Sequence, residues 1–157
     1  MKFLVFVLMP FFISMSVQAQ QPDKKGRVET YNLSDDGVAL DGYDAVSYYA
    51  DDEPKKGVSE ISYTHKGLTY YFLSTANRST FKKTPQKYEP AYGGWCAYAM
   101  GDDGSKVKVD PETYKIIDGE LFLFYNSFWN NTLPDWNENE EALKANADNN
   151  WDTLIKK

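Results

Sequence analysis

The sequence predicts a small α+β domain in which antiparallel β-hairpins pack with a few helices. Two observations predict this class. Segment 114–125 (YKIIDGELFLFY) places Asp118 and Gly119 between β-branched and aromatic runs, a pattern typical of a two-residue hairpin turn. Segment 137–155 carries apolar residues at helical spacing. Hairpins interleaved with a few helices, without a regular strand–helix repeat, indicate the α+β class.

Residues 1–19 have the features of a secretory signal peptide. Lys2 precedes the apolar run 3–17, and a small residue, Ala19, ends the region at a site of the kind that signal peptidase reads. The run is shorter than the about 20 residues that a membrane-spanning helix needs. We therefore expect cleavage after Ala19, a mature chain that begins at Gln20, and a periplasmic or secreted protein without stable membrane insertion.

The composition of the mature chain restricts its partners. About 138 residues remain, the usual size of one domain with its own core. Loss of Lys2 leaves 16 basic against 23 acidic residues, a formal net charge of −7. This acidity disfavours nucleic acid and anionic membranes as partners, because both bind clusters of Lys and Arg. The single cysteine cannot form an intramolecular disulfide, and we expect a monomer.

Segment 20–36 is polar and has no apolar period, so it is predicted to be a flexible lead-in to a domain over 37–157. The first hairpin is predicted from the β-rich runs 61–64 and 68–72. Between them Gly67 permits the reversal of the backbone.

A helix over 75–83 follows, with Ser74 placed to cap its N-terminus. Pro85 ends this helix and begins a short turn that runs through Lys87.

The second hairpin is predicted to bury both of its faces. Side chains alternate along a strand, so pairing across the Asp118-Gly119 turn separates the apolar residues into two sets. One set is Tyr114, Ile116, Leu121 and Leu123, and the other is Ile117, Phe122 and Phe124. In the C-terminal segment the helical stripe consists of Leu143, Ala147, Trp151 and Leu154, with Trp136 one heptad before Leu143.

Several segments together resemble one protein family. They are Gly42–Tyr49 (GYDAVSYY), Gly67–Ser74 (GLTYYFLS), Asn77, Phe81, Pro85–Tyr88 (PQKY) and Tyr92–Tyr98 (YGGWCAY). In order and spacing they are similar to the exported YHS-domain-like proteins, over nearly all of the mature chain. The wider YHS and TRASH-like relatives are associated with heavy metals, often copper, which paired cysteines bind. Here Leu73 and Asn77 stand at the positions of those cysteines, so the resemblance implies the scaffold without the ancestral metal site.

Cys96, the only cysteine, has three readings from the sequence. It packs as a small apolar residue in the core, it binds a metal ion, or it is an exposed or redox-active thiol. If the chain is helical from Trp95 onward, Cys96 and Met100 project from the same face. With His65 they would supply a thiolate, a thioether and an imidazole, a set that suits copper better than Zn²⁺. His65, next to a turn, is otherwise an exposed histidine.

The aromatic content raises a second hypothesis, a pocket for a small organic or protein ligand. The mature chain keeps all 12 Tyr and 4 Trp residues, whose rings are apolar and whose polar groups need partners when buried. The alternative is an aromatic core in which the hydroxyls bond the backbone and Asp44. The candidate pocket residues lie in the segments that carry the resemblance: Tyr43, Asp44, Tyr71, Tyr88, Tyr92 and Trp95.

No enzyme is predicted. The sequence lacks HExxH, GxSxG, CxxC and a glycine-rich phosphate loop, and its one histidine cannot be both a metal ligand and a general base. We therefore expect a non-enzymatic binding module. A soft metal ion, copper, is the first ligand that the sequence suggests, and an organic or protein ligand is the second.

Overall fold

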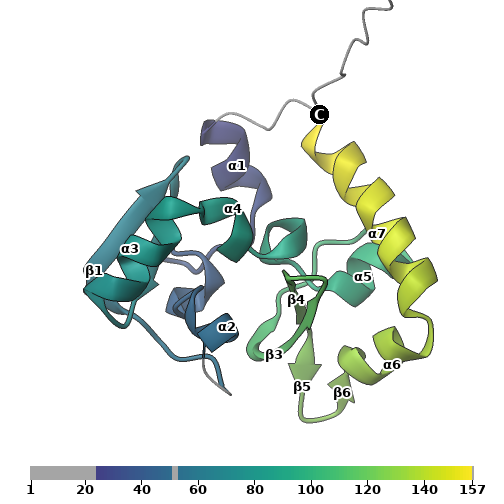
Figure 1. Cartoon of the computed structure of the whole chain (residues 1–157). Coiled ribbons are helices and arrows are strands. Elements are labelled where there is room, and N and C mark those ends of the chain that lie inside the picture. Colours follow the sequence, from purple (N-terminus) through teal and green to yellow (C-terminus); the bar gives the residue numbers. More distant parts are fainter. Residues whose placement is uncertain (1–23, 51–52, 157) are drawn as a thin grey trace, which may run out of the picture.

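The computed structural model describes residues 24–50 and 53–156. Within this part of the chain the fold is α+β, as predicted, with short helices around three antiparallel two-stranded sheets (Figure 1). In chain order the elements are α1 (Lys24–Thr30), the 3-10 helix η1 (Leu40–Gly42), α2 (Ser47–Ala50), β1 (Val58–His65), β2 (Leu68–Phe72), α3 (Thr75–Lys83), α4 (Pro85–Tyr88), the 3-10 helix η2 (Ala91–Gly94), α5 (Ala97–Asp102), β3 (Asp110–Ile117), β4 (Glu120–Phe124), β5 (Asn126–Ser127), β6 (Asn130–Asn131), α6 (Thr132–Glu138) and α7 (Glu140–Ile155).

The β3–β4 hairpin separates the core into two halves, which lie to the left and right of it in Figure 1. Asp118 and Gly119 form its turn with φ angles of 53° and 84°, as a two-residue turn requires. One face of the hairpin belongs to a first cluster with β2, α3 and α4, and the other to a second cluster with α5, α6 and α7. The predicted division of its side chains is confirmed: Tyr114, Ile116, Leu121 and Leu123 belong to the first cluster, and Ile117, Phe122 and Phe124 to the second.

The predicted elements of the first half are also present. β1 and β2 pair antiparallel, with His65 opposite Leu68 beside the turn. Ser74 caps α3, because its hydroxyl accepts a hydrogen bond from the backbone N–H of Asn77 at 3.1 Å. The next helix, α4, begins at Pro85, which fits a first helical position because no N–H is needed there.

The C-terminal helix differs from the prediction. α6 and α7 are separate helices, and Asn139 between them has non-helical backbone angles, with φ −146° and ψ 42°. Trp136 therefore lies in α6, before the break, and its indole N–H donates to Glu140 at 3.0 Å. Trp136 and Leu143 both pack in the second cluster. The helical spacing of apolar residues therefore continues from α6 into α7, and for this reason the sequence does not reveal the break at Asn139.

The prediction of a flexible lead-in over 20–36 is wrong at its centre. Residues 24–30 form the helix α1, which packs against β2 and α7. Its buried residue is Arg27, which is 1% exposed and forms an ion pair with Glu89. Because α1 buries an arginine instead of a stripe of apolar residues, its sequence lacks the pattern of an amphipathic helix and resembles that of a polar linker. The predicted leader, residues 1–19, lies outside the described residues. Among the described helices none has the length and apolarity to cross a membrane.

Candidate functional site

Cys96 is a core residue. Its side chain has no exposed surface, and the residue stands at the N-cap position of α5 without a capping hydrogen bond from its side chain, so the helix begins at Ala97 rather than at Trp95. The sulfur accepts a hydrogen bond from the backbone N–H of Tyr125 at 3.3 Å and lies 3.4 Å from the hydroxyl of Thr132. Of the three readings of this thiol, the geometry favours packing in the core.

The other two predicted metal ligands lie in different halves of the core. Met100 is fully buried in the second cluster and follows Cys96 by one helical turn, with its N–H bonded to the Cys96 carbonyl at 3.0 Å. The His65 ring lies 6.2 Å from the ring of Phe81, in the first half. Burial lowers the pKa of His65 below its usual value. Residues 24–50 and 53–156 contain no group of three or more His, Cys, Asp or Glu side chains placed to hold a metal ion.

The six residues predicted to line a pocket do not surround one cavity. Tyr43 donates to Glu112 at 2.7 Å, and this hydrogen bond raises the pKa of Tyr43 to about 12. The indole N–H of Trp95 donates to the carbonyl of Thr30 at 2.7 Å. Tyr92 lines a cleft between the two halves of the core, and none of the other five residues lines it.

Asp44 has a structural role. Its carboxylate is fully buried and accepts hydrogen bonds from the backbone N–H groups of Val46 (2.9 Å) and Leu73 (2.8 Å). The side-chain amide of Asn77 donates to the same carboxylate at 2.7 Å. Leu73 and Asn77 stand at the positions where the resemblance places cysteines in metal-binding relatives. The Asp44 carboxylate is bound by the backbone of Leu73 and by the side chain of Asn77.

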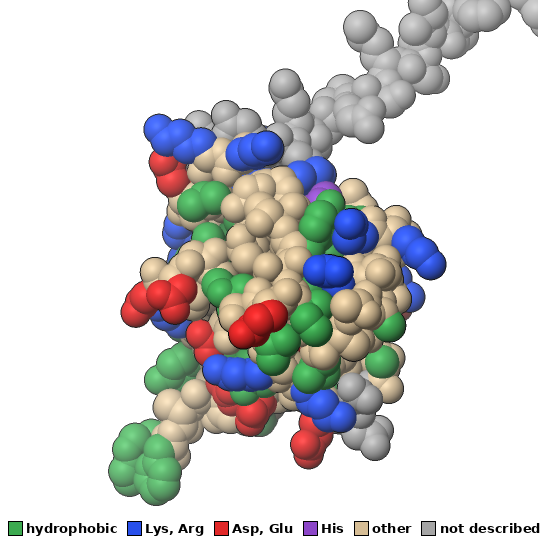
Figure 2. All heavy atoms as spheres, turned by 90° about the vertical axis from the view of Figure 1, so that its left-hand side faces the viewer, with side chains coloured by type: hydrophobic (Ala, Val, Ile, Leu, Met, Phe, Trp, Pro, Cys, Tyr) green, Lys and Arg blue, Asp and Glu red, His purple; other side chains and the backbone are tan. Residues whose placement is uncertain are grey.

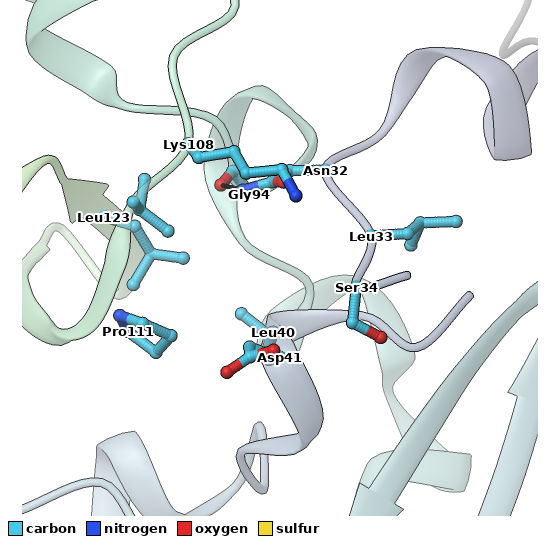
Figure 3. A pocket seen from close by; sticks show the side chains of 10 residues that line it. Asn32, Leu33, Ser34, Leu40, Asp41, Gly94, Lys108, Pro111 and Leu123 are labelled. Atoms are coloured by element: carbon cyan, nitrogen blue, oxygen red, sulfur yellow. Dashed lines mark hydrogen bonds between the residues drawn. The ribbon is translucent and has the colours of Figure 1, made fainter. Parts of the chain in front are cut away.

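A small cavity of about 120 Å³ lies between η1 and the segment that precedes β3. Figure 3 shows the side chains of Leu123 and Pro111 on one side of it and Ser34 on the other, with Asp41 between them. Ligand pockets usually measure about 300–1,000 Å³. This cavity is therefore too small for most organic ligands.

The cleft between the two halves is larger and open, with a volume of about 480 Å³. Its aromatic walls are Tyr31, which follows α1, Tyr92 of η2, Phe122 of β4 and Trp151 of α7. The rings of Tyr31 and Trp151 meet edge to face, with centroids 5.5 Å apart, and those of Tyr92 and Phe122 do so at 5.7 Å. The polar lining consists of Lys66, Gln86, Glu89, Glu120 and Asp148.

The glycines of the YGG sequence allow two walls of the cleft, Tyr31 and Trp151, to lie close to the turn that contains Tyr92. Tyr92 and Gly93 both have left-handed φ angles, of 52° and 62°. A Cβ atom on Gly93 would lie 2.7 Å from the ring of Trp151 and 3.0 Å from the ring of Tyr31. Only glycine at this position leaves room for α7 and the end of α1 to pack against the turn.

One side of the cleft is held by a hydrogen bond from Tyr92 to Asp148. The hydroxyl donates to the carboxylate at 2.8 Å, and Lys144 lies 3.1 Å from the same carboxylate. Burial, together with this hydrogen bond, raises the pKa of Tyr92 above its usual value. The phenol is therefore a neutral donor at every physiological pH, which fixes the ring at the cleft wall.

The other side is held by the buried ion pair of Arg27 and Glu89. Glu89 also accepts a hydrogen bond from the hydroxyl of Tyr70 at 3.0 Å. The Arg27 guanidinium lies over the ring of Tyr31, 4.6 Å from its centroid. The Nε and Nη1 atoms of Arg27 have no partner among the described residues. These contacts fix Tyr31 and Glu89 at the edge of the cleft.

Of the four aromatic walls, only Tyr92 is named as a candidate pocket residue from the sequence, because it lies in a segment that carries the resemblance, and the other three are missed. Tyr31 fell in the predicted lead-in, Phe122 on a hairpin face and Trp151 on a helical stripe. These residues meet only because α1 packs against α7, and α7 packs against η2. No local pattern reports a contact between such distant segments.

Comparisons of the chain with protein-family models, curated proteins and solved structures return no significant match. The resemblance to the exported YHS-domain-like proteins therefore stays a prediction. The cleft itself is the feature from which a function can be inferred.

Proposed function

We propose that the protein is an exported, non-enzymatic binding module that holds a small organic ligand in the cleft between Tyr31 and Trp151. The observation that carries this proposal is the cleft volume of about 480 Å³ together with four aromatic walls. Small-molecule sites have this size. In this cleft five polar side chains stand beside the four aromatic ones, so a ligand needs polar groups as well as an apolar body.

The lining indicates a ligand with an apolar, ring-like body and polar ends. Tyr31 and Trp151 are partly exposed, so their rings offer faces and edges for stacking, whereas Tyr92 and Phe122 are buried. At the rim, Lys66 and Glu120 are exposed and have no ion-pair partner among the described residues. Lys66 lies in the turn of the first hairpin, and Glu120 begins β4. Polar groups of the ligand can therefore contact a cation on one element and a carboxylate on the other.

Copper is the weaker candidate. Cys96 and Met100 have no exposed surface, so a metal ion would reach their sulfur atoms only if the second cluster opened. His65 packs against Phe81, outside that cluster. An organic ligand, by contrast, enters a cleft that is already open.

Ligand-observed NMR with indole and 4-methylphenol as probes tests the proposal. Gln86 lines the cleft from an exposed position on α4, so Gln86→Trp adds a large ring inside the cleft without disturbing the core. We expect saturation transfer from the wild-type protein to at least one probe, and a loss of at least about tenfold in affinity for Gln86→Trp because the cleft is filled.

Lys83→Trp is the matched control, because Lys83 is exposed on α3 and does not line the cleft. It should bind the probes as the wild type does. If neither probe binds at millimolar concentration, or if Gln86→Trp binds as tightly as Lys83→Trp, the cleft is not the ligand site.

A further inference from the structure

The β5–β6 hairpin presents the two most exposed large hydrophobic side chains of the described chain. Phe128 is 89% exposed and Trp129 is 90% exposed. Their rings meet edge to face with centroids 4.6 Å apart. Ser127 pairs with Asn130, so the two aromatic residues form the turn itself, here called the aromatic tip. Figure 2 shows a hydrophobic projection that stands clear of the rest of that surface.

The segment that carries the aromatic tip is uncharged. Segment 126–134 (NSFWNNTLP) contains no Asp, Glu, Lys or Arg, in a chain of which 25% of residues are charged. Its flanking side chains are exposed Asn and Ser. A surface of this kind can enter a less polar environment without desolvating a charge, which is the most costly step in such a transfer.

We propose that the aromatic tip inserts reversibly into the headgroup region of a lipid bilayer with neutral, zwitterionic headgroups. Tryptophan suits this region because its ring is apolar while its N–H can still bond water or lipid oxygen. The segment has no Lys or Arg with which to attract anionic lipid, and the expected mature chain has a net charge of −7. Neutral lipid is therefore the preferred surface.

The size of the aromatic tip favours a bilayer over a protein partner. Two aromatic side chains offer roughly 300–500 Å². A stable protein interface buries about 800 Å² on each partner, so the tip alone is too small for one. Insertion into a bilayer needs no matching surface. We expect weak binding, with an association constant at or below about 10⁴ M⁻¹, the value for a single myristoyl chain.

Membrane contact at this place is independent of the proposed ligand cleft. β5 and β6 lie at the foot of the molecule in Figure 1, whereas α1 and the C-terminal end of α7 lie at its top. A protein that rests on the aromatic tip therefore keeps α1 and the end of α7 directed away from the bilayer.

Sedimentation with phosphatidylcholine vesicles tests the inference. The chain that begins at Gln20 contains every described residue and excludes the apolar run 3–17. We expect this chain to bind the vesicles with a blue shift of Trp129 fluorescence. The double variant Phe128→Ser, Trp129→Ser should bind at least about tenfold more weakly and keep the same melting midpoint, because both side chains are solvent-exposed.

A second double variant, Val58→Ser with Leu73→Ser, is the matched control, because these hydrophobic side chains are 45% and 39% exposed but lie outside the aromatic tip. It should bind the vesicles like the wild type. Vesicles that also contain phosphatidylglycerol should bind no more tightly. The inference is overturned if phosphatidylcholine is not bound, if the tip variant binds undiminished, or if anionic lipid is required. It is also overturned if the tip variant loses only self-association in sedimentation velocity, which would assign the tip to a second copy of the chain.

Discussion

The buried carboxylate of Asp44 joins three parts of the first half: the start of α2 through Val46, the end of β2 through Leu73, and α3 through Asn77. One side chain thus connects two helices and a strand. Asp44→Ala should leave three donors without an acceptor. We expect it to lower the free energy of unfolding by about 3 kcal/mol or more, measured by urea denaturation.

Asp41→Ala is the control for this prediction. Asp41 is 58% exposed and its carboxylate lies 3.5 Å from Lys56, while its φ is 50°. Loss of the ion pair and the strain of alanine at this φ should together cost only about 1 kcal/mol. Equal losses in the two variants would show that Asp44 does not organise the first half.

His65 should make the stability of the protein depend on pH. Burial lowers its pKa in the folded state, so the unfolded chain takes up a proton at a higher pH than the folded protein. Its contribution to stability is therefore complete above pH 6.5, the ordinary value, and is lost as the pH falls below that value. The urea midpoint should decrease between about pH 7.5 and about pH 5.5.

His65→Phe should remove this part of the pH dependence, because a phenyl ring can pack against Phe81 without taking up a proton. The same decrease in both proteins would mean that other groups cause it.

Among the elements, helices α5 and α7 are in close contact at Gly101. A Cβ atom at this position would lie 2.4 Å from the carbonyl oxygen of Leu143, which is backbone and cannot move aside by rotating. Gly101→Ala should therefore push the two helices apart and lower the free energy of unfolding by about 2–3 kcal/mol, measured by thermal or urea denaturation.

Gly119→Ala separates this effect from the general cost of replacing a glycine. Gly119 has open space around it but a φ angle of 84°, so alanine there should cost only about 1 kcal/mol of backbone strain. A Gly101→Ala protein as stable as the wild type would show that the helices can separate without loss.

The elements also show how far the sequence can predict this fold. Both hairpins and α3 were predicted because a turn glycine, a capping serine and a proline lie within a few residues of the structure they define. The alternation along β3 and β4 even predicted which core half each side chain joins. α1 and the break at Asn139 were missed, because a buried arginine and a continuous apolar spacing conceal them. The cleft was missed for a related reason: three of its four aromatic walls acquire their role only from the packing of α1 and α7.

For the whole molecule, we expect the β3–β4 hairpin to make the two halves one folding unit, because its side chains pack in both clusters. Leu121 and Phe122 are neighbours in β4 but pack in opposite clusters. Leu121→Ala should cost about 2–5 kcal/mol and Phe122→Ala about 3–5 kcal/mol. Each variant should still unfold in one transition, because the damaged half shares its hairpin with the other.

Two optical probes test this cooperativity. Trp136 and Trp151 report on the second half by fluorescence, and far-UV circular dichroism reports on both halves. The midpoints from the two probes should coincide in each variant. Separate midpoints would mean that the halves unfold independently.

The contact between Tyr31 and Trp151 has a consequence for the order of events when the protein folds. These residues come from opposite ends of the described chain, so this wall of the cleft requires the closure of the longest loops in the fold. Such contacts form late, because the entropy of closing a long loop is lost before the contact stabilises it. Affinity for the proposed ligand therefore arises only when folding is complete. A nascent chain that still lacks α7 has no binding site. A ligand present during folding therefore stabilises only the native state and none of the earlier states.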